Sequence, residues 1–404
     1  MLSFDQARAL LLERALPLPS ELVPLAQAFG RVLSEPLVAF ANIPAFAYSA
    51  MDGYALATVD LAAEGPFVLP VVGESRTGRP SEALVPGTAS LISTGAELPR
   101  GADAVLPREI VEAQPGPNPR ITFREVPRAG QHIRSAGEDL ARGAVALAGG
   151  TRLGPAALGL AASLDAIELS VARRPRVTVL CTGDELRVAG SAERPGKIPD
   201  SNSLPLATLA TVAGAQARIA AHVGDEREAT ERALAAALVD TDLLLTVGGV
   251  SVGDHDWVRP SLEARGVALD FWKVAIKPGK PIAFGRNAAG TAVLGLPGNP
   301  ASALVTFALF GMPFLRALQG DRQPFPNTLR LPLGAPVRHK AGRLEFVRAQ
   351  LLQTSEALTA VPLQNQASGA LTSLAWADAL VLVPAEVDGL EAGTSVEVLR
   401  LQDF

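Results

Sequence analysis

The chain has 404 residues, of which 48% are hydrophobic and 19% are charged, and its formal net charge is −5. A chain of this length and composition predicts roughly two to four globular domains and excludes intrinsic disorder. The negative balance excludes a general nucleic-acid-binding surface, so any basic site must be local.

The single cysteine, Cys181, excludes an internal disulfide and a cysteine-based metal cluster, and it is typical of a reducing compartment. The N-terminal residues lack the charged and apolar pattern of a signal peptide. The alanine-rich runs at 154–164 and 232–239 are too short or too interrupted to span a membrane. We therefore expect a cytoplasmic protein with neither nucleic acid nor a membrane as its partner.

The sequence of residues 3–164 predicts a helix, then a β-rich region, then a second helix. An amphipathic helix runs from Ser3 to about Ala15, and Ser3 and Gln6 form its capping box. Between residues 31 and 142, short apolar runs such as 67–72, 89–93 and 120–126 lie between Gly/Pro clusters, which predicts a β-rich region. Residues 154–164 predict the second helix.

From residue 176 to 318 predicted strands alternate with predicted helices. The strands are 177–181, 217–222, 243–247 and 293–296, and the helices run over 202–213, 226–239 and 300–318. This alternation predicts a parallel sheet flanked by helices, with ligands at the carboxyl ends of its strands. The loops 182–186, 246–256 and 295–300 follow strands, so we expect them to converge on one edge. After a linker at 324–326, residues 327–404 predict a small β domain.

Two of these loops carry carboxylates. Asp184 and Glu185 either hold a hydrated Mg²⁺ and orient water, or only cap a turn. The run Gly248–Gly253 fits no phosphate-loop or dinucleotide fingerprint, and its backbone N–H groups form either an anion nest or a plain tight turn. Asp254 and Asp256 are two residues apart, so on an extended stretch their carboxylates face one way and suit Mg²⁺.

Three of the chain's five lysines, Lys273, Lys277 and Lys280, fall within eight residues. A lysine is a compact point charge that suits tetrahedral oxyanions. No carboxylate lies within 271–285, so we favour an anion-binding site here over a solvated basic face. Downstream, the run 297–300 predicts a helix start with Asn299 as its N-cap, and a helix N-terminus attracts anions.

Four more motifs lie outside this region: Ser49-Ala-Met-Asp-Gly-Tyr-Ala55, Ser93-Thr-Gly-Ala96, Arg134 to Asp139, and Gln366-Ala-Ser-Gly-Ala-Leu371. Together with Thr182-Gly-Asp-Glu-Leu186, Gly248 to Gly253, Lys273 to Gly285, and Leu296-Pro-Gly-Asn-Pro300, they cover nearly the whole chain. In this order they resemble the molybdopterin molybdenumtransferase family, the bacterial molybdenum-insertion enzymes related to the gephyrin E domain. Cys181, in place of a hydroxyl or small residue, and Asp254-His255 depart from the family pattern.

The resemblance implies an α/β multidomain fold with a central, doubly wound, mostly parallel sheet. The implied parts are a helical linker domain (1–40 plus 140–172), a β-rich inserted domain (41–139), the α/β molybdopterin-binding domain (173–322) and a C-terminal β-barrel-like domain (327–404). It also implies an elongated homodimer in which each active site is shared between subunits. Molybdopterin adenylyltransferase is the upstream partner that it implies.

The reaction implied by the resemblance inserts molybdenum from molybdate into adenylylated molybdopterin and releases AMP, with Mg²⁺ as cofactor. The residues implied as catalytic are Asp52, Thr94, Asp184, Glu185, Asp225, Asp256, Lys273, Lys277 and Lys280. Those implied to bind the pterin nucleotide are Asp139, Gly248, Gly249, Ser251, Gly253, Pro297, Gly298, Asn299, Pro300 and Ser368. Mg²⁺ would be held among Glu185, Asp225, Asp254 and Asp256, with Asp184 as a further candidate.

Two alternatives stay open. Molybdopterin adenylyltransferase shares the α/β domain, but it normally lacks the flanking domains that this sequence predicts. A scaffold role like that of gephyrin belongs to a different class and would not require a site of lysines and carboxylates.

Overall fold

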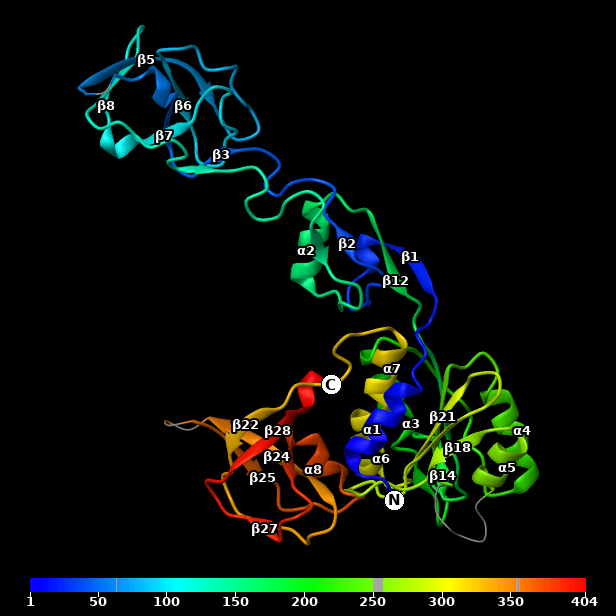
Figure 1. Ribbon diagram of the computed structural model, residues 1–404. Coiled ribbons are helices and arrows are strands. Elements are labelled where there is room, and N and C mark those ends of the chain that lie inside the picture. The colour runs from blue at the N-terminus through cyan, green and yellow to red at the C-terminus, as the bar shows by residue number, and fades with distance from the viewer. Residues whose placement is uncertain (63, 250–256, 354, 356) are drawn as a thin grey trace.

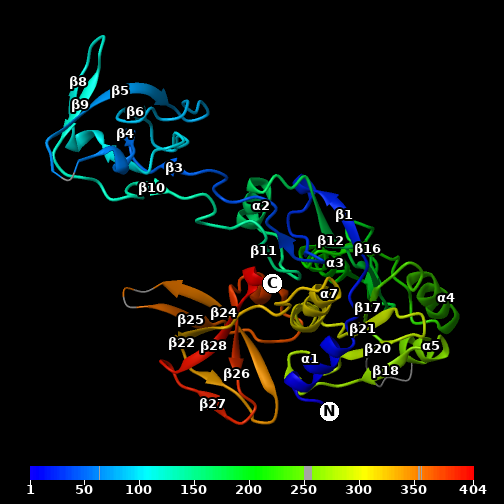
Figure 2. The same cartoon turned by 45° about the horizontal axis from the view of Figure 1, so that its top comes forward.

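The computed structural model describes residues 1–62, 64–249, 257–353, 355 and 357–404. Two views show an extended molecule in which a β-rich unit at one end is joined by a linker unit to a larger body (Figures 1 and 2). That body holds an α/β sheet and a C-terminal sheet side by side. The predicted multidomain α/β architecture is therefore confirmed.

The α/β unit is built on a six-stranded sheet with the order β16-β13-β17-β21-β20-β18. Its parallel strands are β16 (Gln216–Ile219), β13 (Arg176–Cys181), β17 (Leu243–Val247) and β21 (Ala292–Leu296). The strands β20 (Ala283–Arg286) and β18 (Ala268–Phe271) are antiparallel. The β20–β21 connection is too short for a crossover helix and forms a hairpin, which Asn287 Oδ1 closes by accepting from Thr291 N at 2.9 Å.

Helices cover both faces of this sheet (Figure 1). One face packs against α3 (Ser203–Val212), α6 (Pro300–Thr306), α7 (Met312–Leu318) and α1 (Phe4–Glu13). The other packs against α4 (Arg227–Ala237) and α5 (Val258–Ala264). Strand β13 is apolar on both faces, which explains why helices cover both: Val177 and Val179 face the layer of α3, α6, α7 and α1, whereas Leu180 faces the layer of α4 and α5. The sheet is doubly wound, as predicted.

The helix that begins at Pro300 runs to Leu318 and contains a π-helical turn, η4 (Phe307–Gly311). By length and composition it is apolar enough to cross a membrane, but 83% of its most apolar window is buried inside the protein. It is thus the core helix of the α/β unit.

The C-terminal sheet takes one strand from the α/β unit. Its order is β19 (Ile276–Lys277), β24 (Leu344–Gln353), β26 (Ala379–Val383), β28 (Ser395–Arg400) and β22 (Leu329–Pro332). Strand β25 (Leu358–Pro362) pairs with the far half of β24. Leu333 bridges to Ala360, so the sheet curls into a half-barrel, in agreement with the barrel-like domain expected.

The β-rich unit holds a second six-stranded sheet, with the order β7-β4-β6-β5-β9-β8. Its strands are β4 (Gly53–Leu56), β5 (Phe67–Ser75), β6 (Ala89–Ile92), β7 (Ala104–Pro107), β8 (Glu112–Gln114) and β9 (Arg120–Phe123). The apolar runs predicted as strands are β5, β6 and β9. Where the chain enters and leaves the unit, β3 (Tyr48–Ser49) pairs with β10 (Ile133–Arg134).

The linker unit contains both β-strands and a helix, whereas the family resemblance led us to expect a helical unit. Strand β1 (Ser20–Pro24) pairs with β12 (Glu168–Ala172), β2 (Leu37–Val38) pairs with β11 (Val145–Leu147), and α2 (Pro155–Ser163) packs beside them. The outgoing and returning chain run antiparallel here, so they share backbone hydrogen bonds as ribbons.

The first helix, α1, does not pack on the linker. Its predicted capping box is present, since Ser3 Oγ accepts from Gln6 N at 3.2 Å and Gln6 Oε1 accepts from Ser3 N at 2.9 Å. The Phe4 ring meets the rings of Phe310 and Phe346 edge-on, at centroid distances of 5.4 and 5.1 Å. Helix α1 therefore packs where the α/β unit and the C-terminal sheet meet.

Candidate active site

Loops from four parallel strands meet at their carboxyl edge. Thr182 N donates to Val247 O at 3.0 Å, and Gly248 N donates to Leu296 O at 3.2 Å. Gly183 N donates to Val223 O at 2.9 Å, which adds the loop after β16. The predicted convergence of the loops 182–186, 246–256 and 295–300 is confirmed for the residues described.

The glycine turn and the helix start lie in direct contact. Gly248 has φ +86°, and a Cβ there would lie 2.8 Å from Thr182 O, so the close approach requires glycine. A Cβ on Gly298 would lie 3.9 Å from Gly248 Cα. Asn202 Nδ2 donates to Gly298 O at 2.9 Å and ties this turn to the start of α3. Two segments predicted to bind the pterin nucleotide, at 248–249 and 297–300, thus form one surface.

The helix start differs from the prediction in one detail. Pro300 occupies the first turn of α6 and Asn299 is its N-cap residue, as expected. The Asn299 side chain, however, makes no capping hydrogen bond. A Cβ on Gly369 would lie 3.9 Å from Asn299 Oδ1, so the loop that carries Ser368 lies against this side chain.

The lysine segment is held against the same helix. Gly279 has φ +98°, and a Cβ there would lie 2.0 Å from Thr306 Cγ2 in α6. This contact fixes the backbone between Lys277 and Lys280, whose side chains are exposed. Lys273 is exposed as well, and its neighbour Trp272 lines one small cavity together with Gly249.

Lys277 has a partner that the sequence did not reveal. Its Nζ lies 2.8 Å from Glu345 Oε1, because β19 places the two residues opposite each other on β24. The other oxygen, Glu345 Oε2, lies 2.7 Å from His339 Nδ1. The side chains of Glu345 and His339 are only 5% and 2% exposed, whereas that of Lys277 is 47% exposed. The buried pair of Glu345 and His339 thus holds the ammonium group of Lys277, whose side chain is about half exposed.

Arg348 is a second residue that sequence reasoning missed. It is 1% exposed, and burial lowers the pKa of its guanidinium. Its guanidinium donates to Gln366 Oε1 at 3.2 Å, to Ala370 O at 3.1 Å and to Ala367 O at 3.0 Å. Three bonds from one buried group fix the loop around Ser368. Charged residues inside the apolar strand β24 are the sequence signal that points to Glu345 and Arg348.

The carboxylates Asp184 and Asp225 face each other across two loops. Asp225 N donates to Asp184 Oδ1 and Asp184 N donates to Asp225 Oδ2, each at 3.3 Å. Glycines at 183 and 224 leave room, because a Cβ there would lie 2.3 Å from Glu185 Oε2 and 2.4 Å from Asp184 Oδ1. The side chains of Asp184, Glu185 and Asp225 are all exposed. Mg²⁺ prefers hard oxygen ligands and usually takes only one or two carboxylates from a protein, so these residues are suitable candidates. Among the described residues, no group of three or more His, Cys, Asp or Glu forms a closed metal site.

Four predicted site residues, Ser251, Gly253, Asp254 and Asp256, lie outside the described residues. The lysine anion hypothesis also needs one adjustment. The segment 271–285 has no carboxylate of its own, but Glu345 neutralises Lys277 from another strand, so Lys273 and Lys280 carry the uncompensated charge in this part of the described chain.

Asp52 and Thr94 form their own local site in the β-rich unit. Asp52 Oδ1 accepts from Thr94 N at 2.9 Å, so the structure brings these two predicted residues together. Asp139 lies on the return to the linker, where its N–H donates to Ile43 O at 3.0 Å. In both views this unit lies at the opposite end of the molecule from the α/β sheet (Figures 1 and 2). Within one chain, these residues and the lysines are therefore separate.

Cys181, the departure from the family pattern, serves packing. It is buried at the end of β13, and Ser203 Oγ donates to its sulfur at 3.1 Å. Burial raises the pKa of its thiol to about 12. The residue is therefore a neutral member of the core beneath the site.

Three known protein-family regions match consecutive parts of the chain. Residues 2–164 match the MoeA N-terminal region (domain I and II), and residues 178–317 match a probable molybdopterin binding domain. Residues 330–401 match the MoeA C-terminal region (domain IV). The three matches follow one another in the order that the sequence motifs suggested.

Relatives that match nearly the whole chain point to the same family as these three regions. The chain is 40% identical over 388 residues to molybdopterin molybdenumtransferase 2 of Mycobacterium tuberculosis, covering 94% of each chain. It is 38% identical over 413 residues to a molybdopterin molybdenumtransferase of Synechococcus elongatus, covering 99% of this chain and all of that one. The crystal structure of a molybdopterin biosynthesis MoeA protein from Pyrococcus horikoshii superposes with a TM-score of 0.82 at 30% identity, covering 99% of both chains. The chain belongs to the MoeA family of molybdopterin molybdenumtransferases, the enzymes that insert molybdenum during molybdenum cofactor biosynthesis.

Proposed function

We propose that the carboxyl edge of the α/β sheet is where molybdenum passes from molybdate to adenylylated molybdopterin, with release of AMP. The observation that carries this proposal is the contact between the Gly248 turn and the α6 start, with the lysine segment packed against the other end of the same helix at Thr306. Backbone N–H groups at a glycine turn and at a helix start suit the phosphates of such a nucleotide.

Lysines in this segment suit molybdate. Molybdate is a tetrahedral dianion, and a compact ammonium group meets it better than a planar guanidinium does. Lys280 and Lys273 have no ion-pair partner among the described residues, and Lys277 is anchored by Glu345. The chain's single cysteine is buried, so the sulfur ligands for molybdenum must come from the dithiolene of the pterin.

We further propose Mg²⁺ as the cofactor, with its ligands drawn from among Asp184, Glu185, Asp225, Asp254 and Asp256. When bound, the ion would neutralise charge on the phosphoanhydride. The exposed, glycine-flanked carboxylates at 184 and 225 support this proposal. The protein's own part is to orient the nucleotide on the glycine turn and to bring cationic lysines to the developing negative charge.

The proposed active site is shared in a homodimer. Asp52 and Thr94 belong to the predicted set, yet the unit that holds them lies far from the α/β edge of the same chain (Figure 1). A twofold dimer would bring this unit over the partner's cleft and create two equal sites. Molybdopterin adenylyltransferase remains the proposed upstream partner, since its product is the substrate proposed here.

The decisive experiment mixes the purified protein with adenylylated molybdopterin, Mg²⁺ and molybdate, and follows AMP and molybdenum cofactor. We expect both products to appear together and to depend on molybdate. Lys280→Ala should remove most of the activity, whereas Arg232→Ala, an exposed cation on α4, should retain it. Equal activity of the Lys280→Ala variant and the wild type at limiting molybdate would remove the lysine segment from the proposal.

A further inference from the structure

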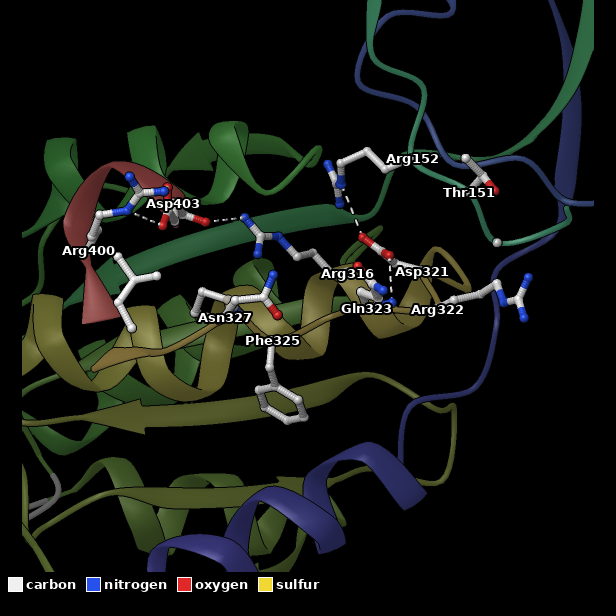
Figure 3. A pocket seen from close by; sticks show the side chains of 13 residues that line it. Thr151, Arg152, Arg316, Asp321, Arg322, Gln323, Phe325, Asn327, Arg400 and Asp403 are labelled. Carbon is white, nitrogen blue, oxygen red and sulfur yellow. Dashed lines mark hydrogen bonds and ion pairs between the residues drawn. The ribbon is translucent and has the colours of Figure 1, made fainter. Parts of the chain in front are cut away.

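A charged hollow lies where three units of the protein meet, away from the proposed active edge. It has a volume of about 990 Å³, within the range of roughly 300–1,000 Å³ typical of small-molecule sites. The linker unit contributes Thr151 and Arg152, α7 contributes Arg316, and the C-terminal end contributes Arg400 and Asp403. Figure 3 shows these side chains gathered around one space.

The charges in this hollow do not balance. Asp321 pairs with Arg152, with Oδ2 3.1 Å from Nε. Asp403 pairs with Arg400 through two bonds of 2.8 and 3.0 Å. Each carboxylate is therefore already matched by one guanidinium.

Two arginines of the hollow have no ion-pair partner among the described residues: the exposed Arg322 and the partly buried Arg316. Arg316 is the informative one. Its Nη atoms donate only to carbonyl oxygens, at 3.5 Å to Pro324 O and at 3.4 Å to Asp403 O. Its Nε is buried without a hydrogen-bond partner among the described residues. Burial, and then the positive charge of Arg152, lower the pKa of this guanidinium. Asp321, which is already paired with Arg152, is the negative charge near Arg316 that partly offsets these effects. A partly buried cation that shares its nearby carboxylate with a second arginine is costly, so the hollow favours an added anion.

We infer that this hollow binds a small phosphate-bearing molecule. Guanidinium groups from three directions suit a tetrahedral dianion with several oxygens better than a flat carboxylate with two. The space exceeds that of a single phosphate, so the ligand carries an organic part as well. Because linker, α7 and C-terminal end all contribute, an occupied site ties the three units together and stabilises the folded chain.

The test is equilibrium dialysis of the full-length protein against radiolabelled inorganic phosphate. We expect saturable binding that Arg316→Gln weakens by about tenfold, the loss of one charge-assisted hydrogen bond. Asn327→Asp should weaken it similarly, because it places a negative charge on the exposed rim without removing packing. Lys280→Ala should leave this saturable phosphate binding unchanged. So should Arg232→Gln, which removes the same charge as Arg316→Gln but on the exposed surface.

Two results would overturn the inference. One is a lack of saturable phosphate binding to the wild-type protein. The other is binding that survives in Asn327→Asp and in folded Arg316→Gln but disappears in Lys280→Ala, which would assign the phosphate to the proposed active edge. Should Arg316→Gln fail to fold, phosphate binding by Asn327→Asp decides between the hollow and the proposed active edge as the binding site.

Discussion

Glu345 Oε1 lies 2.8 Å from Lys277 Nζ across the junction between the α/β unit and the C-terminal sheet. The same carboxylate contacts His339, so a buried acid anchors a lysine that belongs to another unit. The C-terminal sheet thereby takes part in building the proposed molybdate site.

The first prediction concerns this anchor. Glu345→Gln removes the charge that holds Lys277, so kcat/KM for molybdate should fall by about tenfold, the equivalent of one charged hydrogen bond. Measuring kcat and KM separately for molybdate and for the nucleotide checks the role, since the effect should concentrate on molybdate. Glu397→Gln, which breaks an exposed pair with Arg330, should leave both constants unchanged. Equal losses for both substrates would point to a general structural role instead.

The second prediction concerns the close contact between Gly279 and Thr306. Gly279→Ala should displace the lysine segment and lower activity strongly, because its Cβ would lie 2.0 Å from Thr306 Cγ2. Gly290→Ala is the matched control, since that glycine also has positive φ but has nothing within 4 Å. Thr306→Ser removes the clashing methyl group and keeps the hydroxyl that donates to Ser302 O. The double variant should therefore regain part of the activity, and a failure to do so would show that φ strain alone is responsible.

The third prediction tests the proposed Mg²⁺ ligands. Asp225→Asn keeps an oxygen acceptor for the Asp184 N–H but removes a negative charge. The Mg²⁺ concentration for half-maximal activity should rise by about tenfold, while Tm stays nearly unchanged. Asp240→Asn, an exposed carboxylate in an ion pair with Arg176, is the control. An unaltered Mg²⁺ dependence would move the ligand role to Asp254 or Asp256.

The fourth prediction follows from the buried thiol. The pKa of Cys181 is raised to about 12, so at pH 8 the native protein should resist iodoacetamide. Unfolding returns the thiol to its ordinary pKa of about 8.5 and should make it reactive. Because the folded state holds the proton more tightly, this group favours folding below about pH 8.5 and loses that contribution as pH rises toward 12. Mass spectrometry of native and urea-treated protein checks the difference, and rapid native labelling would contradict the burial.

The fifth prediction tests the shared active site. Asp52→Ala and Lys280→Ala homodimers should each be nearly inactive. In mixed dimers one site carries both defects and the other carries neither, so about half of the wild-type activity should return. Tagged subunits purified in tandem after co-refolding allow this measurement. Mixed dimers as inactive as their parents would place Asp52 in the site of its own chain.

The sequence by itself determined the local elements and their order. The capping box at Ser3 and Gln6 and the strands at 177–181 and 243–247 follow from side-chain periodicity and capping, which act over a few residues. Because alternating strands and helices form parallel sheets, convergence of the loops at 182, 248 and 297 was predictable too. Eight ordered motifs were specific enough to indicate the family.

Only the tertiary structure decided which distant residues meet. The pairing of Lys277 with Glu345 depends on β19 joining a sheet formed much later in the chain, and no local pattern specifies that register. The antiparallel β20–β18 edge, the mixed linker and the docking of α1 between two units likewise arise from packing. The excess charge at Arg316 becomes visible only when Asp321 and Asp403 are seen paired with other arginines, because charge balance is a property of neighbours in space.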